Sequence, residues 1–117
     1  MSEQAAPTIT FDEFKKLDIR IAKVIAASDH PNADKLIVIN LDLGNEQRQI
    51  IAGLKPHYTP DALLGKNVVV VTNLQPRKMR GLESNAMLLA AVWDDAGSQQ
   101  VSTIFADDKV PPGAAVT

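Results

Sequence analysis

The chain has 117 residues, 45% of them hydrophobic and 22% charged, with a formal net charge of −2. These values are typical of one globular domain that buries its own core. The sequence contains no cysteine, which excludes disulfides, thiolate zinc sites and cysteine nucleophiles. The acidic balance argues against a general nucleic-acid coater, because such proteins are usually basic over the whole domain. Any polyanion is therefore expected to bind through one localised face.

The N-terminal segment, residues 1–7, has neither the positive charge nor the apolar stretch of a secretory signal. The longest apolar runs are six or seven residues, far below the roughly 20 that a membrane-spanning helix needs. The sequence therefore predicts a soluble, cytoplasmic protein that has no membrane partner.

Residues 1–9 are small and polar, and they are predicted to form a disordered tail before a single domain over residues 10–117. Thr10 and Glu13 have the spacing of a capping box, in which each residue satisfies a backbone N–H of the other. This pair predicts a short helix over residues 11–16.

Period-two alternation of apolar residues begins at Leu17, as in a half-buried strand. The alternation slips at Ala22–Lys23, which predicts a bulge there. Residues 56–64 form a connector with room for one helical turn, and Pro111-Pro112-Gly113 is predicted to end the ordered part of the chain. Five further strands are predicted over residues 36–43, 48–54, 66–74, 86–93 and 99–105.

Six short strands and one small helix predict an all-β fold. The best match is a five-stranded Greek-key barrel of the OB type, with a short N-terminal helix and a short extra strand region at the C-terminus. Such barrels bind oligonucleotides on one face and with the loops around it. An SH3-like barrel is the structural alternative, but the strand lengths and the mid-chain connector favour the OB type.

A cationic segment, residues 73–87, lies between the apolar runs Val68–Val71 and Met87–Val92. No acidic residue occurs between Asp61 and Glu83, whereas this interval contains four cations: Lys66, Arg77, Lys78 and Arg80. Arginine matches phosphate oxygens with a planar fork, and lysine acts as a point charge. The pattern predicts a polyanion-binding patch that is mounted on two strands, with nucleic acid as the first partner to consider.

Four motifs occur in order along the chain: Asp18–Val24, Asn32–Leu36, Leu41–Gly44 and Asn73–Gly81. With them, about residues 11–117 resemble the tRNA-binding domain. That domain occurs at the C-terminus of many bacterial methionyl-tRNA synthetases, as free-standing dimeric proteins, and in a branch, CsaA, described as secretion chaperones. The start at Met1 favours the free-standing form.

The resemblance implies an OB-fold, a homodimer, and non-catalytic recognition of tRNA by its shape at the outer corner of the L. Nothing in the sequence requires a cofactor or a metal, and an aminoacyl-tRNA synthetase is a further candidate partner. Ala86 replaces a glycine of the family pattern, which bears on any positive φ or close backbone approach at that position.

The expected tRNA-binding residues lie on the cationic segment and on one earlier loop, and each has a plainer alternative. The cations are also typical of a solvated loop, and Lys35 could pair with Asp34. Asn73 and Ser84 are also common turn residues. The two methionines are also core fillers, which is the favoured interpretation for Met87. The full set is Lys35, Asn73, Arg77, Lys78, Met79, Arg80, Ser84 and Met87.

Other chemistry is weakly indicated. Aromatic residues are sparse, so stacking on single-stranded bases is disfavoured, and structured RNA fits the composition better. His30 and His57 each lie beside a proline and are expected to be solvated or capping. No nucleophile elbow or glycine-rich phosphate loop is present, so no enzyme is predicted. The alternative function is a CsaA-like chaperone that binds unfolded preproteins. Its cue would be a sizeable exposed apolar patch, which the sequence does not visibly offer.

Overall fold

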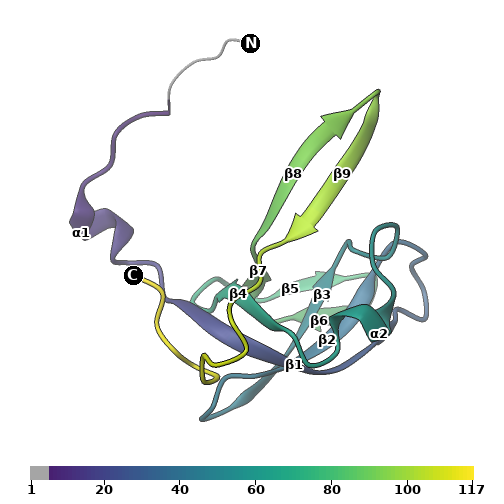
Figure 1. Cartoon of the computed structure of the whole chain (residues 1–117), viewed down its shortest axis with the longest axis horizontal. Coiled ribbons are helices and arrows are strands. Elements are labelled where there is room, and N and C mark those ends of the chain that lie inside the picture. The colour runs from purple at the N-terminus through teal and green to yellow at the C-terminus, as the bar shows by residue number, and fades with distance from the viewer. Residues whose placement is uncertain (1–5) are drawn as a thin grey trace.

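The structure, a computed structural model, describes residues 6–117 (Figure 1). Part of the predicted tail, residues 1–5, lies outside the described residues, and residues 6–10 form neither helix nor strand. Helix α1 spans Phe11–Phe14 and begins with the predicted capping box: Glu13 N–H donates to Thr10 Oγ1 over 3.1 Å, and Thr10 N–H donates to Glu13 Oε1 over 2.9 Å. The helix therefore starts as predicted and ends two residues earlier.

Apart from one further helix, the regular structure in the rest of the described chain is all strands. A second single-turn helix, α2 (Pro60–Leu63), lies in the predicted connector, with Thr59 as its N-cap. Neither helix is long and apolar enough to cross a membrane. The strands are β1 (Ile19–Asp29), β2 (Ile37–Asp42), β3 (Gln47–Ala52), β4 (Asn67–Val71), β5 (Arg77–Met79), β6 (Leu82–Ser84), β7 (Met87–Leu88), β8 (Ala90–Asp95) and β9 (Ser98–Thr103).

Five antiparallel strands form the main sheet in the order β3-β2-β1-β4-β7. The two edges approach one another, because Asn85 N–H donates to the Gln49 carbonyl over 2.9 Å and Ile51 N–H donates to Ser84 Oγ over 2.9 Å. The result is an all-β, nearly closed five-stranded barrel, as predicted. Its interior is filled by alternate residues of β2 (Ile37, Ile39 and Leu41), which are fully buried together with Val24, Ile50, Leu63, Val68 and Val70.

The bulge in β1 occurs later than predicted. The strand pairs regularly with β4 from Ile19 to Lys23, and its register with β2 shifts between Val24 and Ala26. The extra residue is therefore Ile25, which is exposed. A bulge bends its strand, and this one lies where β1 passes from pairing with β4 to pairing only with β2.

The strand predicted over residues 86–93 is in fact two strands. β7 pairs with β4, Leu89 N–H donates to the Val69 carbonyl over 2.9 Å, and the chain then leaves the barrel as β8. β8 and β9 form a separate hairpin that projects from the barrel (Figure 1). An apolar run does not distinguish a strand that stays in a sheet from one that leaves it, so the sequence concealed this break.

The C-terminal segment continues to be ordered beyond Pro111-Pro112-Gly113, contrary to the prediction. It lies along β1: Gly113 N–H donates to the Ile21 carbonyl over 2.7 Å, and Val116 N–H donates to the Ile19 carbonyl over 2.9 Å. The chain turns here with Gly113 at φ +89°, where the Cβ of any other residue would lie 2.3 Å from the Leu43 carbonyl oxygen. Only glycine fits so close an approach.

Candidate nucleic-acid interface

The cationic segment is a hairpin rather than a loop. β5 and β6 pair antiparallel, and the two residues between them, Arg80 and Gly81, have φ values of 54° and 93°. Two positive φ values are typical of the type I′ turn that closes two-residue hairpins. The hairpin therefore presents its cations from a twisted ribbon that leads from β4 to β7.

Strand alternation divides the cations between the two faces of this hairpin. Arg77 lies opposite Ser84, and Lys78 lies opposite Glu83. Directly paired residues share a face, and neighbours along a strand point to opposite faces. Arg77 is therefore directed to one side and Lys78 to the other, so the two cations do not form one continuous clamp.

The Arg77 side of the hairpin faces an open groove of about 570 Å³. The groove runs between the hairpin, the end of β3 and the strands β7 and β8. Four of the predicted site residues lie on it: Arg77, Met79, Ser84 and Met87. Its remaining lining is mostly apolar and includes Ile51, Leu54, Leu74, Ala86, Leu88, Val92 and Val101.

A second hollow, of about 360 Å³, brings together two of the four remaining residues of the predicted site, Lys35 and Arg80. It is lined by Ala33, Asp34, Lys35 and Leu36 of the loop between β1 and β2, and by Arg80 of the hairpin turn. Arg80 Nε also donates to the Asn32 carbonyl over 3.3 Å. Lys35 and Arg80 therefore meet at one surface although they are distant in the sequence.

The four cations of the predicted site are exposed. Among the described residues, the ion pairs join Arg20 with Asp18, Arg48 with Glu46 and Lys55 with Asp29. None of these pairs includes Lys35, Arg77, Lys78 or Arg80. The Lys35–Asp34 ion pair considered above is thus absent from this set.

Asn73 and Ser84 are engaged within the fold. Asn73 Oδ1 accepts from Asp18 N–H over 2.9 Å, and its Nδ2 donates to the Lys16 carbonyl over 2.6 Å. Ser84 is buried, and its Oγ accepts from Ile51 N–H and donates to the Ala86 carbonyl over 3.3 Å. Asn73 thus holds the segment before β1, Ser84 holds the end of β3 beside the groove, and a direct contact with RNA stays a prediction for each.

The two methionines do not behave alike, and neither belongs to the buried core. Met87, for which the sequence favours core packing, is 46% exposed, and Met79 is half-buried.

Ala86 packs against the core from the groove, and Arg80 and Ala96 are the only non-glycine residues of positive φ in the described chain. The backbone at Ala86 therefore does not require the glycine of the family pattern.

His30 is the residue whose role the sequence concealed. The sequence predicts a solvated or capping side chain, but His30 is only 5% exposed. Its Nδ1 accepts from Asn32 N–H over 2.9 Å, which is a capping contact, and its Nε2 lies 3.0 Å from the Met79 carbonyl oxygen. A histidine beside a proline in a loop gives no local signal for a partner so far along the chain.

Within residues 6–117, no group of three or more His, Cys, Asp or Glu side chains could hold a metal ion. Both ring nitrogens of His30 already have backbone partners. What the arrangement can do is present cations beside an apolar groove, which suits binding of an anionic polymer.

Comparisons with known proteins identify the family and the fold of the chain. The sequence profile of the tRNA binding domain family matches residues 19–115. Over 92% of the chain, 51% of residues are identical to a methionine–tRNA ligase of Thermococcus kodakarensis, of which the match covers 14%. The chain thus spans about a seventh of the length of such relatives.

Two solved structures have the same fold over nearly the whole chain. The MetRS related protein of Pyrococcus horikoshii is 35% identical, with a TM-score of 0.89, and the alignment covers 96% of this chain and 100% of that one. The chaperone CsaA of Bacillus anthracis is 27% identical, with a TM-score of 0.81, and the coverage is 95% and 100%.

Proposed function

Because this chain belongs to the tRNA binding domain family, we propose that it is a non-catalytic module that holds tRNA by its folded shape, at the outer corner of the L. The observation that carries the proposal is the hairpin of β5 and β6. It presents Arg77, Lys78 and Arg80 outside any ion pair of the described residues, on a protein whose net charge is −2. A localised cationic surface on an acidic body favours one well-placed contact over general coating of nucleic acid.

The proposed contact surface has three parts. Arg77 faces the apolar groove, Arg80 and Lys35 share the smaller hollow, and Lys78 lies on the opposite face of the hairpin. Contacts with phosphates fix the position of a nucleic acid without reading its sequence. Three separated cationic points are suited to a curved backbone, such as that of a folded RNA. We assign Met79 and Met87 to apolar contacts at the groove, Ser84 to holding the groove's border at β3, and Asn73 to holding the segment before β1.

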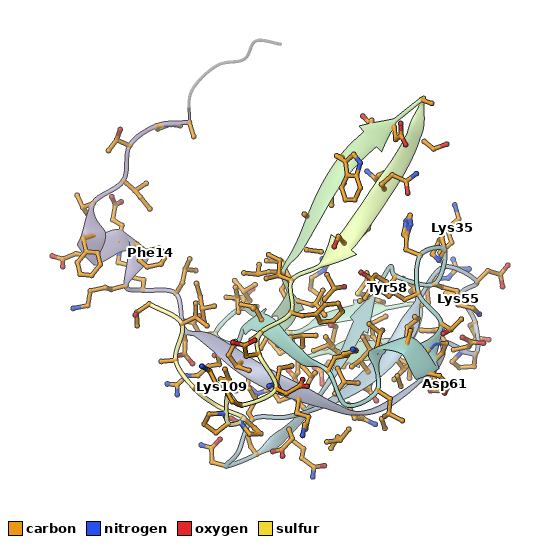
Figure 2. The ribbon with its side chains drawn as sticks, in the orientation of Figure 1. Phe14, Lys35, Lys55, Tyr58, Asp61 and Lys109 are labelled. Atoms are coloured by element: carbon orange, nitrogen blue, oxygen red, sulfur yellow. The ribbon has the colours of Figure 1, made fainter. Side chains whose placement is uncertain are left out.

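Titration of bulk tRNA against single alanine variants tests the proposal. Each of Arg77→Ala, Lys78→Ala and Arg80→Ala should weaken binding to different tRNAs alike. Each should also lower the slope of log K against log salt by about one. The matched control is Lys109→Ala, since Lys109 is an exposed lysine on another part of the molecule from Lys35 (Figure 2). Equal affinity of all four variants would refute the proposal.

The site on the RNA is tested separately by footprinting of the bound tRNA. Protection is expected where the D and T loops meet, with the anticodon and acceptor ends remaining accessible. Protection of the anticodon arm alone would contradict the outer-corner assignment.

We also propose that the chain acts as a homodimer. Apolar side chains are exposed on the two parts that project from the barrel: Phe11 of α1 is 71% exposed, and Val92 and Trp93 of β8 are 56% and 50% exposed. Surfaces of this kind mark association sites. A methionyl-tRNA synthetase is the protein partner that the relatives suggest, and a role in binding tRNA implies work in the cytoplasm.

One observation supports a second candidate function. The apolar groove beside Arg77 is a surface of the kind that the chaperone alternative requires, although the sequence did not reveal it. Binding of an unfolded preprotein and of tRNA, compared at two salt concentrations, separates the two functions. A peptide signal without a tRNA signal would favour the chaperone.

A further inference from the structure

His30 is a buried side chain that joins the loop bearing Lys35 to the hairpin turn bearing Arg80. It follows the last residue of β1 and lies at the base of the loop that contains Lys35. At 5% exposure, its ring is shielded from solvent and does not itself contact a large ligand.

The two hydrogen bonds of the ring determine where its proton lies. A backbone N–H only donates, so Nδ1, which lies 2.9 Å from the Asn32 nitrogen, must be unprotonated. A backbone carbonyl only accepts, so Nε2, which lies 3.0 Å from the Met79 oxygen, must carry the hydrogen. Both partners therefore fit the Nε2–H tautomer of the ring.

These two bonds tie different segments. The bond to Asn32 closes the β1–β2 loop on itself, as does the bond from His30 N–H to the Leu36 carbonyl (3.1 Å). The bond to Met79 leaves that loop and reaches the residue that precedes the Arg80–Gly81 turn.

The hairpin depends on such ties, because a two-stranded hairpin is marginally stable by itself. β5 and β6 pair only with each other, outside the main sheet. At the end of the hairpin opposite the turn, Gln49 Nε2 donates to the Glu83 carbonyl over 3.0 Å, and Ser84 Oγ accepts from Ile51 N–H. The turn end is held by His30, together with the longer contact from Arg80 to the Asn32 carbonyl.

We propose that His30 is a positioning residue for tRNA binding: its Nε2–H bond to the Met79 carbonyl fixes the turn that bears Arg80 against the loop that bears Lys35. This inference rests on the proposed function, and it makes the affinity for tRNA depend on a buried residue that does not itself touch the RNA. Without the bond, the two cations are no longer held at a set separation, and docking must first order the turn, which lowers affinity.

A matched pair of variants isolates this bond. In His30→Asn the side-chain oxygen can still accept from the N–H two residues on, as asparagine does in turns, but the side chain is too short to reach Met79. In His30→Gln the amide nitrogen can reach the Met79 carbonyl, and the local bond is lost. Each variant therefore loses one hydrogen bond of the native pair.

We expect His30→Asn to weaken tRNA binding about three- to tenfold, the loss of one hydrogen bond, and His30→Gln to bind within about twofold of the native protein. A purely structural role would make the two variants equal, or order them by their thermal stability, which is measured alongside. Native-like binding by His30→Asn, or weaker binding by His30→Gln than by His30→Asn, would overturn the proposal.

Two further measurements complete the test. Nitrogen-15 NMR of the free protein near neutral pH should show protonated Nε2 and bare Nδ1, and the opposite tautomer would overturn the proposal without any RNA. Arg77→Ala is titrated in parallel. If it weakens binding and His30→Asn does not, His30 has no positioning role and the proposed function stands. If Arg77→Ala and the other hairpin variants are also native-like, the proposed function itself fails.

Discussion

At the scale of single residues, Arg80 occupies a backbone conformation that does not suit it. Its φ of 54° lies in the left-handed region, which costs a side-chain-bearing residue about 1–2 kcal/mol. Asparagine tolerates this conformation and is favoured at the first position of type I′ turns. An arginine at such a position fits the proposed role of its side chain in binding tRNA.

This conflict predicts opposite effects from one substitution. Arg80→Asn should raise the free energy of unfolding by about 0.5–1 kcal/mol, while it weakens tRNA binding because a cation is lost. Urea denaturation and tRNA titration of the same preparation measure the two quantities. A variant that loses both stability and binding would show that Arg80 supports the fold rather than the ligand.

Gly113 makes a second residue-scale prediction, this time about stability alone. Gly113 and Gly65 both have positive φ, at +89° and +81°, but only Gly113 is crowded, because a Cβ added there would lie 2.3 Å from the Leu43 oxygen. Gly65→Ala should lower the free energy of unfolding by about 1 kcal/mol because of the strained φ. Gly113→Ala should lower it by about 3 kcal/mol because the backbone must also move. Equal midpoints of thermal unfolding for the two variants would show that the C-terminal segment yields without cost.

At the scale of elements, the segments that flank β1 and β4 are joined by Asp18. The hydroxyl of Thr72 donates to the Asp18 carboxylate, and Arg20 Nε lies 2.9 Å from its Oδ1. The hydrogen bond from Thr72, followed by that from Arg20, holds the pKa of Asp18 below its ordinary value. The unfolded chain therefore binds the proton more readily than the folded one.

The lowered pKa of Asp18 adds to the free energy of unfolding. This contribution is fully present above the ordinary aspartate pKa of about 3.9, and it is lost as the pH falls below that value. Thr72→Val removes the donor of the leading hydrogen bond, so its stability should fall less steeply than that of the native protein below about pH 4. Thermal unfolding from pH 3 to pH 7 checks this. Parallel curves would show that the hydrogen bond from Thr72 to Asp18 does not contribute to acid sensitivity.

The sequence predicted those elements whose signals are local. Alternation identified β2, where Ile37, Ile39 and Leu41 all face the core, and the Thr10–Glu13 spacing identified the start of α1. It did not predict the break at Leu89, where the chain leaves the barrel, because the apolar run continues through it. For the candidate site, the sequence identified the cationic residues themselves but not how they are arranged. The placement of Arg77 and Lys78 on opposite faces depends on the register of the hairpin, and the hydrogen bond from His30 to Met79 depends on a tertiary contact.

At the scale of the whole molecule, the shape is more extended than the length requires. The Cα radius of gyration is 15.1 Å, against about 13 Å for a compact domain of this length. Figure 1 shows the reason: α1 and the β8–β9 hairpin both project from the barrel. Projecting parts that carry exposed apolar side chains are poorly stabilised in a monomer, which is why the proposed homodimer is expected to bury them.

This expectation gives a prediction with an internal control. Phe11→Ser combined with Trp93→Ser should shift the mass in light scattering at micromolar concentration from dimer to monomer, because it removes two large apolar side chains from the proposed contact. Leu64→Ser is the matched control: Leu64 is 52% exposed but follows α2, which lies on the barrel away from both projecting parts (Figure 1). It should leave the mass unchanged. If the native chain is already a monomer, the dimer proposal is wrong. If Leu64→Ser also dissociates the dimer, the contact lies elsewhere on the barrel.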